Sequence, residues 1–255
     1  MVDSTTSENP YFAVGPFYHR HTATILLQGS GDDTGQDMWL TALFLSLHPL
    51  LGHVKIILLP TVPIMPATGN GRRRTPPWFD TLLFDIESQD EKGLSGAVGR
   101  IKEVIQAERK AGIPPNRIVI GGLGQGGALA IVTGLTTAEP LAGVFLLSSY
   151  VPKLRRNVQD VATKLAAHLP LFWGHGQCDS QVKYDFALAC ARQLAADLGV
   201  RFQLTEKAQT REDLEKNGID GLRFHSYPSL GHRIAPDELD DLVVWTAYLL
   251  PDIKL

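Results

Sequence analysis

The chain has 255 residues, and its 24 basic and 27 acidic side chains leave a formal net charge of −3 at neutral pH. This near balance argues against a nucleic-acid-binding surface as the main function, because such a surface usually makes its domain strongly basic. No apolar run is long enough to span a bilayer, and residues 1–10 lack the basic and apolar segments of a secretory signal. The two cysteines, Cys178 and Cys190, are therefore expected to be free thiols, and the protein to be cytoplasmic.

Short β-rich runs alternate with longer helical patterns along most of the chain. Strands are predicted at residues 22–27, 54–60, 117–122, 143–149, 169–175 and 222–227. Helices with apolar residues at helical spacing are predicted at residues 94–111, 185–198 and 237–250, and a helix-prone stretch follows Gly127. This alternation predicts an α/β fold with a mostly parallel central sheet and helices on both faces.

The pattern indicates a single domain over residues 1–255. Residues 1–19 form an N-terminal extension, in which residues 11–17 are expected to pair antiparallel at one edge of the sheet. Two loop excursions near the site are predicted, at 62–80 and 205–221, because long segments of this kind in a compact domain are usually functional or disordered. Within the second, the run from Thr210 to Asp213 resembles a helix-capping box, and it is read either as a surface helix or as a flap near the active site.

The most specific motif joins a buried strand to a helix through glycines, Gly122-Leu-Gly-Gln-Gly126. This is the context of the nucleophile elbow, G-x-S-x-G, in which a strained turn lifts a serine above the sheet edge. Gly122 and Gly126 occupy the outer positions of the pattern. Gly124 occupies the centre, where a hydrolase carries its nucleophilic serine.

The other two members of a hydrolase triad follow in the expected chain order. Asp179 comes just after the strand predicted at 169–175, and His232 lies between the last predicted strand and the last helix. Nucleophile, acid and base is the order found in α/β-hydrolases. Because the carboxyl ends of parallel strands meet at one sheet edge, we expect Gly124, Asp179 and His232 to converge there.

These motifs resemble the acyl-protein thioesterases and carboxylesterases of the phospholipase/carboxylesterase type, particularly the fungal members. The resemblance covers roughly residues 20–255 and implies an α/β-hydrolase fold. Besides the elbow it rests on Gln28-Gly-Ser-Gly-Asp32, Pro60-Thr-Val-Pro63, Trp78-Phe-Asp80, His175-Gly-Gln-Cys-Asp179 and Gly231-His232.

The resemblance also implies roles for particular residues. It places the oxyanion hole at the backbone N–H groups of Ser30 and Gln125, and substrate contacts at Trp78 and Phe79. It implies an acyl ester, a thioester or an acylated protein as substrate, and it requires neither a cofactor nor a metal. Nucleic acid and a transmembrane segment are not expected, and a homodimer is left open.

The glycine at position 124 leads to three functional hypotheses, because without a side-chain oxygen the usual acyl-enzyme cannot form. The chain is a hydrolase whose serine was replaced, either by engineering or by natural loss. Alternatively, it is a non-hydrolytic catalyst of proton abstraction, condensation or cyclisation on acyl compounds, which retains Asp179 and His232 as an oriented base. The third hypothesis is an acyl-binding pseudoenzyme on the same fold.

Overall fold

The computed structural model describes residues 12–15, 21–28, 35–59, 78–79, 90–152 and 158–253. Within these ranges eight strands form one sheet, in the order β1-β3-β2-β4-β5-β6-β8-β7. The strands are β1 Phe12–Val14, β2 Ala23–Gln28, β3 Val54–Leu59, β4 Ile118–Leu123, β5 Gly143–Leu147, β6 Leu171–Gly176, β7 Phe202–Thr205 and β8 Leu222–Tyr227. Neighbouring strands run parallel except β1, which pairs antiparallel with β3 at the edge. The predicted α/β architecture with a mostly parallel sheet is confirmed.

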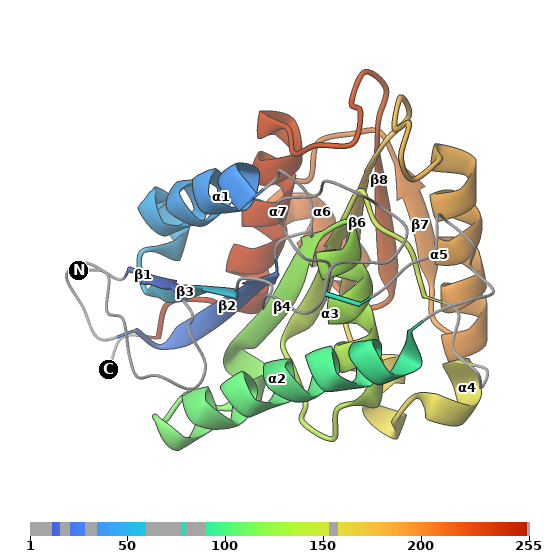
Figure 1. Ribbon diagram of the computed structural model, residues 1–255. Coiled ribbons are helices and arrows are strands. Elements are labelled where there is room, and N and C mark those ends of the chain that lie inside the picture. Colours follow the sequence, from blue (N-terminus) through green and yellow to red (C-terminus); the bar gives the residue numbers. More distant parts are fainter. Residues whose placement is uncertain are drawn as a thin grey trace.

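Helices cover both faces of this sheet (Figure 1). They are α1 Gly35–Leu47, α2 Glu91–Lys110, α3 Gln125–Thr136, α4 Val158–Val161, α5 Tyr184–Leu198, α6 Arg211–Asn217 and α7 Pro236–Leu249. Helices α2, α3 and α5 contribute to one hydrophobic cluster, and α1 and α7 contribute to the cluster on the opposite face. Short 3-10 turns lie at Pro49–Leu51, Pro115–Arg117 and Lys164–His168.

Strand β5 shows why the central strands are apolar along their whole length. Val144 and Leu146 pack into the cluster that contains α3, whereas Phe145 and Leu147 pack into the cluster that contains α7. Successive strand residues point to opposite faces, and both faces here are covered, so polar alternation is absent. The central strands are thereby fixed in register, with their carboxyl ends at one edge of the sheet.

Most predicted elements are present with small shifts at their ends, but α1, α4 and β7 were not predicted. Helix α1 is apolar on nearly all sides and shows little contrast at the helical period, so its sequence gave no amphipathic signal. The capping box at Thr210 is present at the start of α6, where its Oγ1 accepts a hydrogen bond from the Asp213 N–H at 3.1 Å.

Some predictions fall outside the described residues. These include Ser30, most of the extension at 1–19, and the excursion at 62–80 apart from Trp78 and Phe79. In the described part of the chain, no helix combines the length and the apolar character needed to cross a membrane.

Candidate active site

The turn between β4 and α3 has the backbone geometry of a nucleophile elbow. Gly124 lies there at φ 55° and ψ −118°, a conformation that residues with a Cβ adopt only under strain. Its N–H donates to the Leu147 carbonyl at 2.9 Å, and its own carbonyl accepts from the Ala128 N–H at 3.0 Å. The Ser149 hydroxyl donates to the same carbonyl at 2.7 Å. Both peptide groups of Gly124 are therefore held by β5, the turn that follows it, and α3.

The neighbouring glycines allow the helix to approach the sheet closely. A Cβ on Gly127 would lie 2.7 Å from Ser149 Oγ and 2.8 Å from the Gly122 carbonyl, too close for ordinary packing. A Cβ on Gly121 would strike the ring of Phe145. The glycine-rich sequence is thus required by the tight strand–turn–helix packing, independently of any chemistry at residue 124.

Asp179 lies in the loop that follows β6, and three donors hold its carboxylate. Oδ1 accepts from the N–H groups of Gln181 and Val182 at 2.8 and 2.9 Å, and Oδ2 lies 2.9 Å from His232 Nδ1. Burial alone would raise the pKa of Asp179, but the hydrogen bonds and the charge of His232 lower it below its usual range. The carboxylate is therefore ionised at neutral pH and has a fixed orientation.

His232 lies between β8 and α7, and its side chain is almost fully buried. Because Nδ1 donates to Asp179, the ring presents Nε2 as the nitrogen that can exchange a proton with a reacting group. The structure thus brings together Asp179 and His232, which the sequence places 53 residues apart. It also places Gly124 at the same edge, since β4, β6 and β8 belong to one parallel sheet.

A second histidine, His175, lies near the end of β6 and supports the loop that carries Asp179, called here the acid loop. The sequence places His175 in the motif that ends at Asp179 but predicts no role for it. Its ring is fully buried, with Nε2 2.9 Å from the Val182 carbonyl and Nδ1 3.4 Å from Trp173 Nε1. Burial lowers the pKa of His175 despite the opposing effect of Asp179. A neutral ring that donates from Nε2 fits these contacts, so His175 anchors the loop just beyond Asp179.

Glu238, on the first turn of α7, is a further buried acid that sequence reasoning missed. Its side chain packs against Gly174 of β6, where a Cβ would collide with the carboxyl group. Burial, together with the charges of Asp241 and Asp179, raises the pKa of Glu238 to about 8. Glu238 is one of four acidic residues between Pro236 and Asp241, so the sequence alone does not distinguish it from its exposed neighbours.

The side chain of Gln125, which follows the elbow, holds the segment of Trp78 and Phe79. Its Oε1 accepts from the Trp78 N–H at 3.1 Å, and its Nε2 donates to the Phe79 carbonyl at 3.3 Å. Both aromatic side chains are only 2% exposed, and the Arg100 guanidinium lies 5.2 Å from the Trp78 ring centre. The two aromatics are therefore packed in the core beside the elbow, and their contact with substrate stays a prediction. Ser30, the other predicted oxyanion donor, lies outside the described residues.

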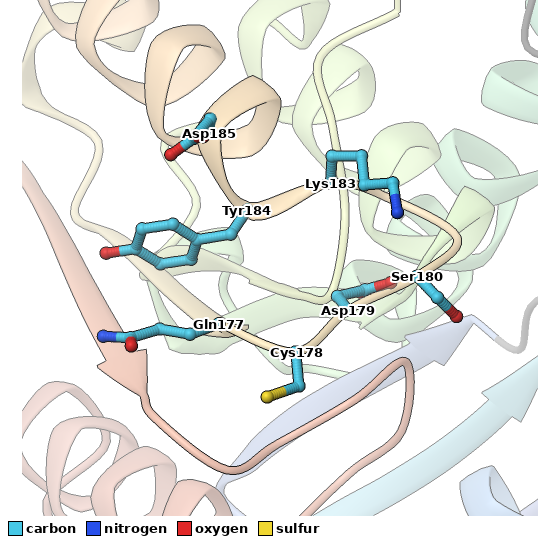
Figure 2. Close-up of a pocket in the computed structure, with 7 residues that line it drawn as sticks. All are labelled: Gln177, Cys178, Asp179, Ser180, Lys183, Tyr184 and Asp185. Carbon is cyan, nitrogen blue, oxygen red and sulfur yellow. The ribbon is translucent and has the colours of Figure 1, made fainter.

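An open pocket of about 530 Å³ adjoins the acid loop (Figure 2). Its lining consists of Gln177, Cys178, Asp179, Ser180, Lys183, Tyr184 and Asp185. Cys178 extends away from Asp179, and its Sγ lies 3.3 Å from the Pro228 carbonyl (Figure 2). Because neither Gly124 nor His232 lines this pocket, it is not the expected position of a reacting acyl group.

In the ranges that the structure describes, no group of three or more His, Cys, Asp or Glu side chains could hold a metal ion. Cys178 and Cys190 are both free thiols.

Comparison with known proteins places these features in a family. The profile of the Phospholipase/Carboxylesterase family matches residues 10–215, which include Gly124 and Asp179 and end before His232. Acyl-protein thioesterase 1 of Cryptococcus neoformans var. neoformans is 36% identical over 230 residues, covering 88% of this chain and 91% of the relative. Acyl-protein thioesterase 1 of Mycosarcoma maydis is also 36% identical, over 95% of each chain.

Solved structures agree with this assignment. The crystal structure of Zea mays acyl-protein thioesterase 2 superimposes with a TM-score of 0.69 at 25% identity, covering 95% of this chain and 99% of that one. The predicted α/β-hydrolase fold is thereby confirmed. The profile match, the fungal relatives and the fold together establish that this chain belongs to the phospholipase/carboxylesterase family of α/β-hydrolases.

Proposed function

We propose that the protein has a site of the acyl-ester and thioester hydrolase type, for substrates carried by small molecules or by acylated proteins, at the sheet edge where β4, β6 and β8 end. The observation that carries this proposal is the hydrogen bond between Asp179 and His232 at the sheet edge that also carries a turn with elbow geometry. The names of the fungal relatives, acyl-protein thioesterases, support the choice of substrate class. A cytoplasmic location belongs to the same proposal and is supported by the two free cysteines.

In this proposal His232 is the base, and Asp179 orients its ring and stabilises the imidazolium that forms. The backbone N–H groups of Ser30 and Gln125 would bind the oxyanion, each worth about 3 kcal/mol of transition-state stabilisation. Gly124 supplies no hydroxyl, so the chain as written cannot form an acyl-enzyme at the elbow. We therefore propose a hydrolase machinery that lacks its nucleophile.

The experiment compares the unsubstituted chain with Gly124→Ser and with Gly124→Ser/His232→Ala. A fluorophosphonate probe should leave the unsubstituted chain unmodified and label the serine variant stoichiometrically, as measured by mass spectrometry. The serine variant should also hydrolyse p-nitrophenyl esters and acyl thioesters, and the double variant should lose this turnover. A stoichiometric adduct on the unsubstituted chain would reveal a different nucleophile, and turnover that survives His232→Ala would show that His232 is not the base.

A second candidate function is favoured by the coexistence of Gly124 with an intact Asp179–His232 pair. A base without a nucleophile suits proton abstraction, condensation or cyclisation of an acyl compound, with the oxyanion donors stabilising an enolate. An acyl-binding protein without chemistry has no use for the paired base. If Gly124→Ser produces no hydrolysis although acyl compounds bind, the site at Gly124 and His232 is no longer suited to hydrolysis, and this second function is favoured.

A further inference from the structure

The chain segment that carries His232 lies against two glycines of β6. At Gly176 an added Cβ would collide with the Leu230 carbonyl, which also accepts a hydrogen bond from an N–H of the acid loop at 3.0 Å. At Gly174 an added Cβ would collide with the carboxyl group of Glu238, on the first turn of α7. Because the two glycines are two residues apart in one strand, they face the same side of the sheet. The segment is therefore held on β6 at both ends, with His232 between them.

The contact at Glu238 is of a different kind from the contact at Leu230. Leu230 uses its main chain, whereas Glu238 uses a carboxyl group that is fully buried and has no hydrogen-bond partner for either oxygen among the described residues. The Ala235 N–H favours the charged form of Glu238, but burial outweighs this effect. A buried carboxylate without hydrogen bonds costs far more free energy than the uncharged acid. The contact with Gly174 therefore requires a proton on Glu238.

Two ionised carboxylates flank Glu238. Asp241 follows it by three residues on α7, and Asp179 acts on it from the acid loop. Burial opposes the ionisation of both aspartates, but their hydrogen bonds lower the pKa of each carboxyl group below its usual range. Burial and the charges of these two groups raise the pKa of Glu238 to about 8. At neutral pH the flanking charges thus favour the uncharged form of Glu238.

Titratable groups of β8 face the same region. His225 pairs with Gly174 in the strand register, so its side chain lies on the same face of the sheet. His225 Nδ1 lies 3.5 Å from Asp241 Oδ2, and the Tyr227 hydroxyl donates to that oxygen at 2.8 Å. Both β8 side chains therefore contact Asp241, and neither gives the carboxyl group of Glu238 a hydrogen bond.

We propose that Glu238 is a positioning residue, whose uncharged carboxyl group packs the first turn of α7 on Gly174 and so holds His232 against Asp179. When Glu238 releases its proton to solvent in alkaline solution, the carboxylate leaves Gly174 for water, and the segment is held only at Leu230. The hydrogen bond between His232 and Asp179 is then lost. As a contribution to catalysis this role rests on the proposed function, but the position of His232 can be measured without turnover.

Proton NMR of the unsubstituted chain follows this position through the proton on His232 Nδ1, which the hydrogen bond with Asp179 protects from exchange. Its signal, identified by its absence from His232→Ala, should weaken about tenfold between pH 7 and pH 9. One pH unit above a pKa of about 8, only about a tenth of the carboxyl groups remain uncharged. In Glu238→Gln the signal should persist at pH 9, and Glu238→Met serves in the same way should Glu238→Gln fail to fold. Glu215→Gln, which changes a glutamate of α6 whose side chain is 54% exposed, should lose the signal as the unsubstituted chain does.

Two further measurements separate this role from simple structural support. In the Gly124→Ser background ester turnover should fall about tenfold between pH 7 and pH 9, and adding Glu238→Gln should remove this fall. Urea unfolding should show Glu238→Gln gaining stability relative to the unsubstituted chain as the pH rises from 4.5 to 8. Over that range the folded chain retains a proton on Glu238 that the unfolded chain releases, so the stability of the unsubstituted chain falls.

Three results would overturn the proposal. A Nδ1 signal that persists at pH 9 in the unsubstituted chain shows that ionisation of Glu238 does not release His232. A signal that is lost equally from Glu238→Gln and Glu238→Met assigns the loss to another group. A stability difference that stays constant from pH 4.5 to 8 shows that Glu238 is not held uncharged. If Gly124→Ser has no turnover although the NMR result is as expected, the proposed function fails, whereas the role of Glu238 in holding His232 stands.

Discussion

His232 and Asp179 share a 2.9 Å hydrogen bond, while two backbone N–H groups hold the other oxygen of the carboxylate. Because each carboxylate oxygen has its own hydrogen-bond partners, the effect of Asp179→Asn in the Gly124→Ser background can be predicted. The backbone donors will keep the amide oxygen, so the amide nitrogen will face His232 and cannot accept from Nδ1–H. His232 is then held in the wrong tautomer, and ester turnover should fall on the order of 10⁴-fold.

Cys178→Ser is the matched control for this variant. Cys178 adjoins Asp179 in the chain, but its Sγ lies against the Pro228 carbonyl. Turnover of Gly124→Ser/Cys178→Ser should therefore match that of Gly124→Ser. A loss for Asp179→Asn no larger than for Cys178→Ser would contradict the role assigned to the carboxylate.

Much of the scaffold was predictable because buried strands and amphipathic helices have distinct patterns. The continuous apolar runs of β3, β4 and β5 could be recognised since both faces of each strand are covered. Helix α1 could not be recognised, since its outer leucines remove the polar face on which a helical period depends.

The candidate site also contains residues that could be predicted from the sequence and residues that could not. Asp179 and His232 could be paired in advance because each follows a strand of one parallel sheet, and chain order then assigns acid and base. His175 and Glu238 could not be assigned, because their importance comes from burial and from neighbours distant in sequence. The side-chain role of Gln125 could not be assigned either, since its hydrogen bond with the Trp78 N–H depends on tertiary packing rather than on the elbow motif.

Glu108 predicts how the stability of the fold depends on pH. This carboxylate of α2 is 2% exposed and accepts hydrogen bonds from Thr24 Oγ1 at 2.6 Å and from Lys55 Nζ at 2.7 Å. Burial opposes ionisation, but these donors and His21 lower the pKa of Glu108 to about 2 from an ordinary value of 4.5. The folded state therefore gains stability from Glu108 above pH 4.5 and loses it as the pH falls toward 2, on the order of 3 kcal/mol in all.

Urea unfolding of Glu108→Gln and of the unsubstituted chain, at neutral pH and at a series of acidic values, checks this expectation. The variant should be less stable at neutral pH, and the difference should shrink as the pH falls through the range between 4.5 and 2. Glu215→Gln is the control, since both side chains of its ion pair with Arg211 are more than half exposed and such pairs contribute little. A constant difference across the series would show that the ionised form of Glu108 is not what stabilises the fold.

Gln125→Ala should loosen the segment of Trp78 and Phe79. The substitution removes an acceptor from the Trp78 N–H and a donor to the Phe79 carbonyl, at a cost of about 1–2 kcal/mol. Amide hydrogen exchange at Trp78 should accelerate while exchange in β5 stays slow. Gln193→Ala, which removes an exposed contact with Asp197 on α5, should change neither. Unchanged exchange at Trp78 in Gln125→Ala would mean that other contacts hold the segment.

The substitution that tests hydrolysis, Gly124→Ser, should also lower the free energy of unfolding. At φ 55° and ψ −118° a residue with a Cβ carries strain of about 1–3 kcal/mol. The serine regains part of this because it has less conformational freedom in the unfolded chain than glycine, so the net loss should be about 1 kcal/mol.

Gly96→Ser makes the same chemical change in α2, where no atom lies within 4 Å of the added Cβ and φ is not in the left-handed region. There the helix should gain a few tenths of a kcal/mol, since serine forms helices better than glycine. Denaturant unfolding of both variants gives the two differences, and opposite signs are expected. If both variants gained stability alike, the elbow would relax around a side chain, and the fold would accept a nucleophile without strain.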